Sequence, residues 1–283
     1  MPYVEHPQCQ TPSDDALLWR YMDFVKFVHL LESQRLWLTR LDLLDDPREG
    51  RYTNSELAKF RKAPKDMLDV IPAESFVSCW HESGFESMAM WDLYGGKVGS
   101  LAIKSSVTSI KQAIQASVNV MIGRIKYIDW SSQSLPPENV IALCVRKAEG
   151  YRHESEVRLV AWEPTLGMSE MGAEAEAGEP ALDLGRLANQ FVKALRQTYP
   201  SMKCDDEAVQ QFVATAILRS AREDYIKAMP RGIGIEVELQ TLVREIVVGP
   251  REPEWIAELV KSVLSKYDMS LPVKRSALRH DGN

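Results

Sequence analysis

The stretch Tyr151–Trp162 constrains the fold most, because it places charged side chains within an apolar run. Its alternation predicts a β-strand, since side chains two apart on a strand point the same way. One parity carries Glu154, Glu156 and Arg158, which on a strand lie about 7 Å apart at about 3.3 Å per residue. The other parity predicts an apolar face formed by Val157, Leu159 and Ala161.

Two interpretations of this charged face remain open. On a central strand, carboxylates are costly to bury unless a cation pairs with them, and Arg158 is a ready partner for Glu154 and Glu156. On an edge strand, the same three side chains form a solvated face. The residues that accompany the strand favour the first interpretation.

Composition bounds the class of protein. The chain has 283 residues, of which 45% are hydrophobic and 26% charged, as in ordinary globular proteins. A net charge of −6 argues against broad binding to nucleic acid or to acidic membranes. No apolar run approaches the length of a membrane span, and we expect no signal peptide.

The cysteines predict a reducing, cytoplasmic compartment. They are far apart and form no paired CxxC spacing, so we expect neither disulfides nor a zinc ribbon. Cys79 and Cys144 lie in apolar, strand-like runs and are predicted to be buried thiols. The four positions are Cys9, Cys79, Cys144 and Cys204.

The order of the elements predicts a single α+β domain over 17–283, preceded by a flexible lead-in at 1–16. A mixed, largely antiparallel, bent sheet with flanking helices fits the absence of a regular βαβ rhythm. We expect a mobile loop at 164–181 and a helical insertion at 182–229. The predicted strands are 17–21, 36–39, 75–80, 98–103, 118–127, 140–146, 151–162, 232–239, 245–248 and 271–275. The predicted helices outside the insertion are 23–34, a helix capped by Thr53 and Glu56, 86–94, 105–116 and 253–267.

An acidic turn at Asp42–Gly50 offers further charges. Asp46 and Glu49 flank Pro47, where acids usually bond nearby backbone amides. The alternative is that they meet Arg20 or Arg158 in a buried structural network.

Five stretches, taken together and in order, resemble a widespread uncharacterised bacterial family, domain-of-unknown-function family twenty-nine seventy-one. The resemblance spans about Leu18 to Leu278 and implies no activity. Two departures are Asp45, where the family has Asn, and the helical insertion. The stretches are Trp19-Arg20-Tyr21, Leu36–Thr39 leading into Asp45–Glu49, Met90-Trp91-x-x-Tyr94 with Gly99, Glu154-x-Glu156-x-Arg158, and Glu245–Pro250.

The chain also resembles ADP-ribosyltransferase-like folds, which place a cation on the first strand, a polar or aromatic group on a second and a glutamate on a late strand. This resemblance implies NAD as cofactor and no metal. It implies Glu156 as the catalytic carboxylate, Glu154 orienting an acceptor, and Arg20 holding a phosphate or the ribose. The residues implied to bind the cofactor are Arg20, Tyr21, Thr39, Trp91, Tyr94 and Arg158.

The resulting hypothesis is a cytoplasmic bacterial enzyme that transfers ADP-ribose from NAD to a macromolecule, or hydrolyses NAD. Toxin, defence and regulatory roles all suit such a glycosyl transfer. One alternative is a metal-dependent nuclease using Asp46, Glu49, Glu154 and Glu156 as oxygen ligands. Another is a non-catalytic sensing or binding module with a structural Glu–Arg network. His81, after an apolar strand, is a candidate base.

Overall fold

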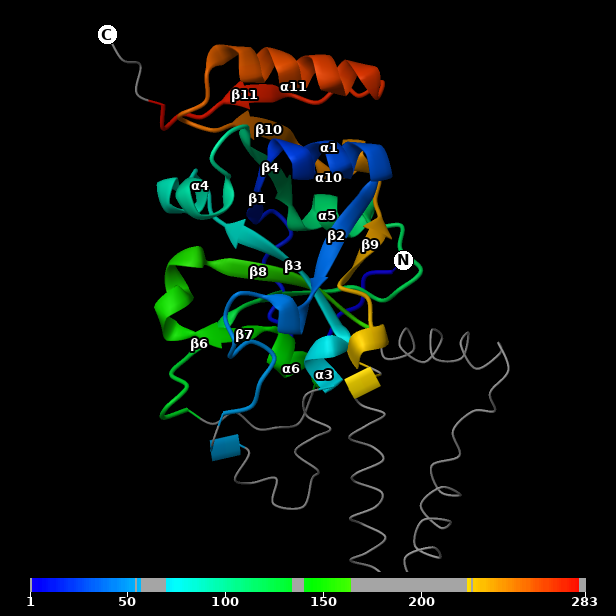
Figure 1. Ribbon diagram of the computed structural model, residues 1–283, viewed down its shortest axis with the longest axis vertical. Coiled ribbons are helices and arrows are strands. Elements are labelled where there is room, and N and C mark those ends of the chain that lie inside the picture. The colour runs from blue at the N-terminus through cyan, green and yellow to red at the C-terminus, as the bar shows by residue number, and fades with distance from the viewer. Residues whose placement is uncertain are drawn as a thin grey trace, which may run out of the picture.

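The computed structural model describes residues 2–53, 55–56, 70–133, 140–163, 223–224 and 226–279. The predicted loop at 164–181 therefore lies outside the described residues. So does the predicted insertion at 182–229, except for its last few residues. Within the described ranges, α-helices cover a mixed sheet (Figure 1). The α+β class predicted from the sequence is confirmed.

The elements follow the predicted order closely. The strands are β1 Leu17–Asp23, β2 Arg35–Arg40, β3 Ser75–Glu82, β4 Ser100–Ser106, β5 Met121–Arg124, β6 Lys126–Ile128, β7 Arg146–Ala148, β8 Glu156–Trp162, β9 Gly232–Glu236, β10 Glu245–Val248 and β11 Val273–Arg275. The helices are α1 Phe24–Ser33, η1 Leu41–Leu43, α3 Val70–Ala73, α4 Met88–Tyr94, α5 Val107–Ala113, α6 Val140–Cys144, η3 Glu149–Glu154, α10 Leu239–Leu242 and α11 Glu254–Lys266, where η marks a 3-10 helix.

The main sheet has nine strands in the order β11-β10-β4-β1-β3-β2-β9, with β8 and β5 continuing from β3. Its pairs are antiparallel except β10 with β11. A separate parallel pair joins β6 and β7.

Strand β3 forks this sheet. One of its edges pairs with β8 from Ser75 to His81. The other edge is shared, because Phe76 and Val77 pair with β2 while His81 and Glu82 pair with β1. Within the described chain, no strand pairs with Ser78–Trp80 on that edge. The strands β1 and β2 therefore separate along this edge of β3, and we call the stretch between them, at Ser78–Trp80, the opening.

Alternation along the strands builds separate apolar layers. In β1, Leu18 and Met22 join the large core beneath α1, α5, α10 and α11, whereas Trp19 and Tyr21 join a small cluster under α4. In β8, Val157, Leu159 and Ala161 face the large core, as predicted. The residues of the large core contributed by these helices include Phe27, Leu31, Ile110, Leu242, Val260 and Leu264.

Local signals explain the helix between the diverging strands. The Asp23 carboxylate accepts a hydrogen bond from the Lys26 amide at 2.8 Å and caps α1, as the sequence predicts. The helix ends at Gln34, whose φ of 50° lies in the left-handed region. This short turn returns the chain as β2, beside the opening.

Three sequence-based assignments need correction. The predicted strand 118–127 is two strands, because β5 pairs with β8 whereas at β6 the Lys126 amide donates to the Val145 carbonyl at 2.8 Å and the chain pairs with β7. The predicted strand 140–146 is helix α6 followed by β7, since a short buried apolar run fits either structure. Residues 149–154 form the 3-10 helix η3 rather than strand, so Glu154 is not on β8.

The residues before β1 contact the sheet. The Val120 amide donates to the Pro2 carbonyl at 2.8 Å, and the Arg124 amide donates to the Gln10 carbonyl at 2.9 Å. Cys9 is buried in the cluster that contains Val160. The segment predicted as a flexible lead-in thus runs alongside β5.

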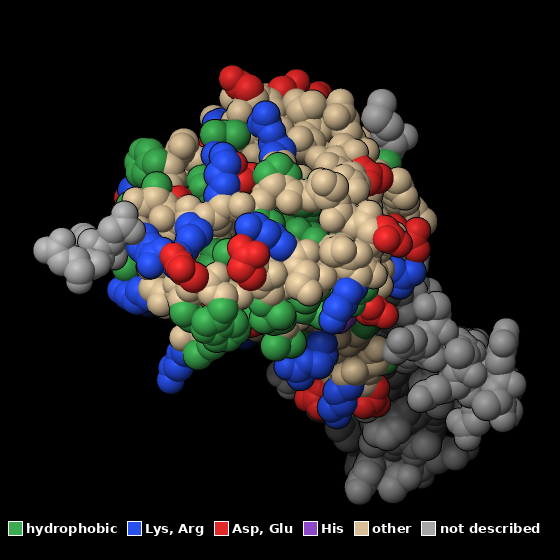
Figure 2. Space-filling model, turned by 90° about the horizontal axis from the view of Figure 1, so that it is seen from above, with side chains coloured by type: hydrophobic (Ala, Val, Ile, Leu, Met, Phe, Trp, Pro, Cys, Tyr) green, Lys and Arg blue, Asp and Glu red, His purple; other side chains and the backbone are tan. Residues whose placement is uncertain are grey.

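The surface above α11 mixes both signs of charge. Lys and Arg side chains are interspersed there with Asp and Glu (Figure 2), so no extended basic region covers this face. Among the helices that the structure describes, none has the length and apolarity to cross a bilayer.

Gly232 gives a test of the fold beside the opening. Its missing Cβ would lie 2.6 Å from the Leu38 carbonyl oxygen and against the Trp37 ring. We predict that Gly232→Ala lowers the free energy of unfolding by about 1–3 kcal/mol in urea titrations, because the backbone cannot give way. Gly150→Ala is the control, since nothing lies within 4 Å there; equal stability of the two variants would contradict the packing.

Candidate functional site

A cavity of about 880 Å³ occupies the opening between β1 and β2. This volume is within the range of about 300–1,000 Å³ typical of small-molecule sites. Its floor includes Ser78–Trp80, the part of β3 that neither β1 nor β2 pairs with. The sequence-predicted residues that line it are Arg20, Tyr21, Thr39, Asp46, Glu49, His81, Tyr94, Glu154, Glu156 and Arg158.

Trp91 is placed elsewhere. It is buried under α4 against Tyr21, with ring centroids 4.8 Å apart, and its Nε1 donates to Glu86 at 3.1 Å. It is not among the residues that line the cavity. The tryptophans that line the cavity are Trp19, Trp37 and Trp80, and of these Trp37 of β2 is 41% exposed whereas the other two are buried.

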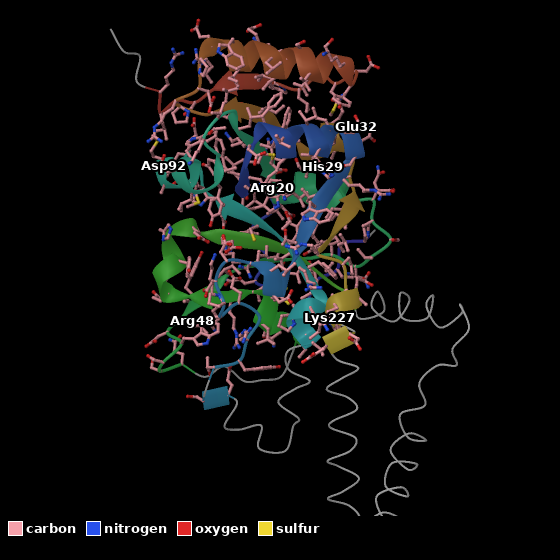
Figure 3. The ribbon with its side chains drawn as sticks, in the orientation of Figure 1. Arg20, His29, Glu32, Arg48, Asp92 and Lys227 are labelled. Atoms are coloured by element: carbon pink, nitrogen blue, oxygen red, sulfur yellow. The ribbon has the colours of Figure 1, made fainter. Side chains whose placement is uncertain are left out.

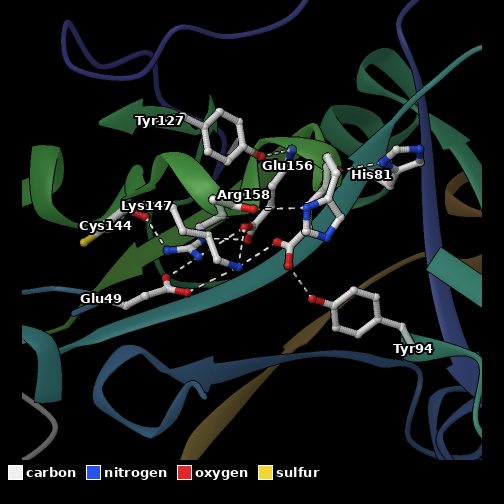
Figure 4. Close-up of polar contacts among 11 residues, drawn as sticks. Glu49, His81, Tyr94, Tyr127, Cys144, Lys147, Glu156 and Arg158 are labelled. Atoms are coloured by element: carbon white, nitrogen blue, oxygen red, sulfur yellow. Dashed lines mark hydrogen bonds and ion pairs between the residues drawn. The ribbon is translucent and has the colours of Figure 1, made fainter. Parts of the chain in front are cut away.

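One end of the cavity is an ionic network buried under η3 (Figure 4). Arg158 Nε lies 2.6 Å from Glu156 Oε1, and its Nη2 contacts Glu49. Lys147 Nζ lies 2.6 Å from Glu154 Oε2, 3.3 Å from Glu156 Oε2 and 3.4 Å from Glu49 Oε1. Three carboxylates thus share two cations, which leaves one net negative charge at this end.

Neutralising contacts set the protonation of the network. Burial alone would raise the pKa of Glu156, but Arg158 and Lys147 outweigh it and lower the pKa to about 2. Burial raises the pKa of Glu49. Together with the nearby negative charge of Glu156, it outweighs the lowering effect of Arg158. The pKa of Lys147 lies above its ordinary value, since Glu156 and Glu49 outweigh its burial. Glu156 is therefore ionised at neutral pH.

Glu154 reaches the network by a different route from that predicted. Ser155 adopts a φ of 40°, which ends η3 and separates Glu154 from the strand. Glu154 Oε1 nevertheless accepts a hydrogen bond from the Tyr94 hydroxyl at 2.8 Å. Burial, and to a smaller extent the Glu154 carboxylate, raises the pKa of Tyr94. Lys147 thus brings Glu154 and Glu156 together, although they do not share a strand.

The acidic turn divides between its two predicted roles. Glu49 contacts Arg158 and joins the network. Asp46 forms the turn, since its Oδ1 accepts from the Arg48 amide at 3.0 Å. Among the described residues, Asp46 makes no ion pair, and its Oδ2 is buried without a hydrogen-bond partner.

The other end of the cavity carries Arg20, a half-buried residue of β1 (Figure 3). Its Nη2 donates to the Trp37 carbonyl at 3.1 Å, which bridges β1 and β2. It lies over the Trp80 ring at 6.0 Å. No carboxylate pairs with it within the described chain, and burial lowers its pKa to about 10. Arg20 is therefore a charged, unneutralised guanidinium facing the cavity.

Two buried polar atoms accompany Arg20 at the cavity wall. Ser78 Oγ and Trp80 Nε1 have no hydrogen-bond partner among the described residues. A buried polar group without a partner costs about 1–3 kcal/mol. Both atoms are enclosed by the protein, although their residues line the cavity.

Sequence reasoning missed two features of the site. Lys147, at the centre of the network, comes directly after a predicted strand. The one signal that it faces the site is that neighbouring strand residues, here Arg146 and Lys147, point to opposite faces. Cys79 was predicted to be buried but is exposed to the cavity. Its deep position and the nearby Glu156 raise the pKa of this thiol well above its ordinary value, so it is protonated at neutral pH.

The network leaves no room for a metal among its acids. The three carboxylates converge on Lys147 Nζ, which stands where a cation would bind. In the ranges that the structure covers, no group of His, Cys, Asp and Glu is arranged to hold a metal ion.

Three solved structures are similar to this chain, without a match to a family model. No family model and no curated protein matches the sequence, so membership of the uncharacterised bacterial family stays a prediction. Solved structures of DarT from Thermus sp. 2.9 are similar over 94% of this chain and 97% of theirs with NAD+, and over 95% and 97% with ADP-ribosylated ssDNA. A third, with carba-NAD+, matches over 94% and 96%. Their identities are 10%, 9% and 11% and their TM-scores 0.36, 0.36 and 0.33, which assign the chain to no family.

The sharing of cations predicts unequal effects on stability. Arg158→Ala leaves three carboxylates with Lys147 alone and removes the hydrogen bond that Arg158 donates to the Cys144 carbonyl at 3.0 Å. We predict a loss of about 3–5 kcal/mol in the free energy of unfolding, as for other broken buried pairs. Glu156→Gln keeps both cations paired with Glu49 and should lose less.

Urea denaturation of the two variants measures this difference. Arg152→Ala is the control, because its ion pair with Glu149 is exposed to solvent and contributes little to stability. Equal losses for Arg158→Ala and Glu156→Gln would show that the carboxylates do not depend on Arg158.

Proposed function

We propose that this protein binds NAD in the cavity and is an ADP-ribosyltransferase-like enzyme, which transfers ADP-ribose to a macromolecule or to water. One observation carries the proposal: a single cavity has an unneutralised Arg20 at one end and a carboxylate network of net charge −1 at the other. NAD has the matching polarity, because its diphosphate is anionic and its nicotinamide ring is cationic.

The acidic end suits the chemistry of this bond. Cleavage between nicotinamide and ribose develops positive, oxocarbenium-like charge on the ribose. Glu156 is ionised and fixed by Arg158 and Lys147, so its charge needs no rearrangement during the reaction. Glu156 would hold the ribose 2′-hydroxyl, and Glu154 would orient the acceptor.

The cationic end suits the diphosphate. A guanidinium has five N–H donors, and one described contact, to the Trp37 carbonyl, accounts for a single donor of Arg20. The exposed ring of Trp37 and the phenol of Tyr94 offer aromatic surfaces for a base between the two ends. The DarT structures named above contain NAD+, carba-NAD+ or ADP-ribosylated ssDNA, but the proposal rests on the cavity and not on that likeness.

A second candidate is a non-catalytic module that senses a dinucleotide. It is favoured by the ion pairs that every acid of the network already makes with Lys147 or Arg158. Such a module would bind NAD in the same cavity without consuming it, so turnover separates the two candidates. A metal-dependent nuclease is disfavoured by Lys147 at the point where the acids converge.

Loss of one charge tests the catalytic role. We predict that Glu156→Gln lowers the rate of NAD turnover by ~10²–10³-fold, because it removes the carboxylate at nearly constant shape. Labelled NAD is incubated with the protein and a cell lysate, and label on protein, nucleic acid or free ADP-ribose is measured. Glu149→Gln, in an exposed ion pair outside the cavity, is the control; a parental rate for Glu156→Gln would refute the assignment.

Loss of the cation tests the binding polarity. We predict that Arg20→Met raises the dissociation constant for NAD by about 10–100-fold, since a hydrogen bond to a charged group contributes about 1.5–3 kcal/mol. Nicotinamide riboside, which lacks the diphosphate, should bind both proteins equally. Calorimetric titration gives both constants, with exposed Arg251→Met as control. Unchanged NAD affinity in Arg20→Met would place the diphosphate elsewhere.

A further inference from the structure

His81 lies beside the acids of the cavity on the neighbouring strand. It is the register partner of Glu156, and directly opposite residues on antiparallel strands present their side chains on the same face. Its side chain is 8% exposed and lines the cavity. Its other neighbours are Tyr21, at 6.2 Å between ring centroids, and the backbone of Glu154.

One contact fixes the tautomer of this imidazole. His81 Nδ1 lies 2.6 Å from the Glu154 carbonyl oxygen (Figure 4). A carbonyl oxygen only accepts, so Nδ1 carries the proton. In the neutral ring, Nε2 then has a free lone pair.

That lone pair is open to the cavity. Among the residues that the structure describes, no group bonds to Nε2, and the atom is not sealed within the protein. The same arrangement, one ring nitrogen held by a backbone acceptor and the other directed at substrate, orients histidines that act as bases. The carbonyl of Glu154 therefore orients His81, while the carboxylate of Glu154 belongs to the ionic network.

We infer that His81 is the general base that activates the acceptor in the reaction proposed above. The acceptor is an O–H group of water or of a macromolecule. Its oxygen forms a bond to C1′ of the ribose as the bond between C1′ and the nicotinamide nitrogen breaks. The bonding electrons leave with nicotinamide, which becomes neutral, and the acceptor proton passes to His81 Nε2.

The surroundings fit the charge that this step creates. Protonated His81 faces Glu156 across the strand pair and Glu154 at the end of η3, both within the network of net negative charge. The imidazolium forms as the positive charge on the ribose disappears. The proton then passes from Nε2 through the open cavity to solvent.

The inference rests on the proposed function, and His81→Asn tests it separately. The asparagine amide can still donate to the Glu154 carbonyl, so the variant keeps the orienting contact and lacks the base. We expect kcat to fall by ~10²–10⁴-fold, with the dissociation constant for NAD within about 3-fold of parental. Added imidazole should restore part of the rate, and His6→Asn, outside the cavity, should match the parent.

The outcomes separate the role of His81 from the proposed function. Parental kcat in His81→Asn, or a loss confined to NAD affinity, overturns the role of His81 and leaves the proposed function standing. A parent that binds NAD but never consumes it overturns both. A ¹⁵N NMR spectrum of the parent adds a test without turnover or a variant: protonated Nδ1 with bare Nε2 supports the inference, and protonated Nε2 with bare Nδ1 overturns it.

Discussion

Strand β3 shares one edge between two partners, and the cavity exists because of that sharing. Pairing with β2 at Phe76–Val77 and with β1 at His81–Glu82 forces the two strands apart in between. The ten-residue helix α1 connects them at the far side of the opening. Arg20 then spans the gap by its contact with the Trp37 carbonyl. The backbone pairing thus places a cation over a stretch of β3 that no described strand covers on that edge.

The buried network supplies the opposite charge. Its members come from the turn at Glu49, from β7, η3 and β8, so it forms only when the fold is complete. Buried ion pairs often contribute little net stability compared with apolar packing, because desolvation offsets their attraction. Three acids around two cations are therefore better explained by what they do in the cavity. They keep Glu156 ionised, as its pKa of about 2 indicates.

Sequence alone predicted the residue types of this site but not its geometry. The apolar run Leu17–Tyr21 and the alternation in Tyr151–Trp162 were enough to place Arg20 and Glu156 on strands, and the cap at Asp23 located α1. Nothing local indicated that Ser155, a non-glycine residue with a φ of 40°, would take Glu154 off the strand. The strand predicted over helix α6 was also wrong, because a short run of apolar residues fits a buried helix and a strand equally.

Long-range contacts account for the other misses. Nothing in the sequence distinguishes Lys147 from other lysines, because its three carboxylate partners are brought to it only by the fold. Trp91 looked suitable for stacking, but the register of β1 puts Tyr21 against it and seals it into the core. The sharing of one β3 edge between β1 and β2 could not be predicted, since the sequence of Ser75–Glu82 is that of one continuous strand.

The polarity of the cavity is the central claim, and a crystal structure of the protein with carba-NAD+ tests it most directly. We predict the diphosphate within hydrogen-bond distance of the Arg20 guanidinium, and the nicotinamide-side ribose against Glu156 and His81. A ligand bound in the reverse direction, or bound outside the opening between β1 and β2, would contradict the account.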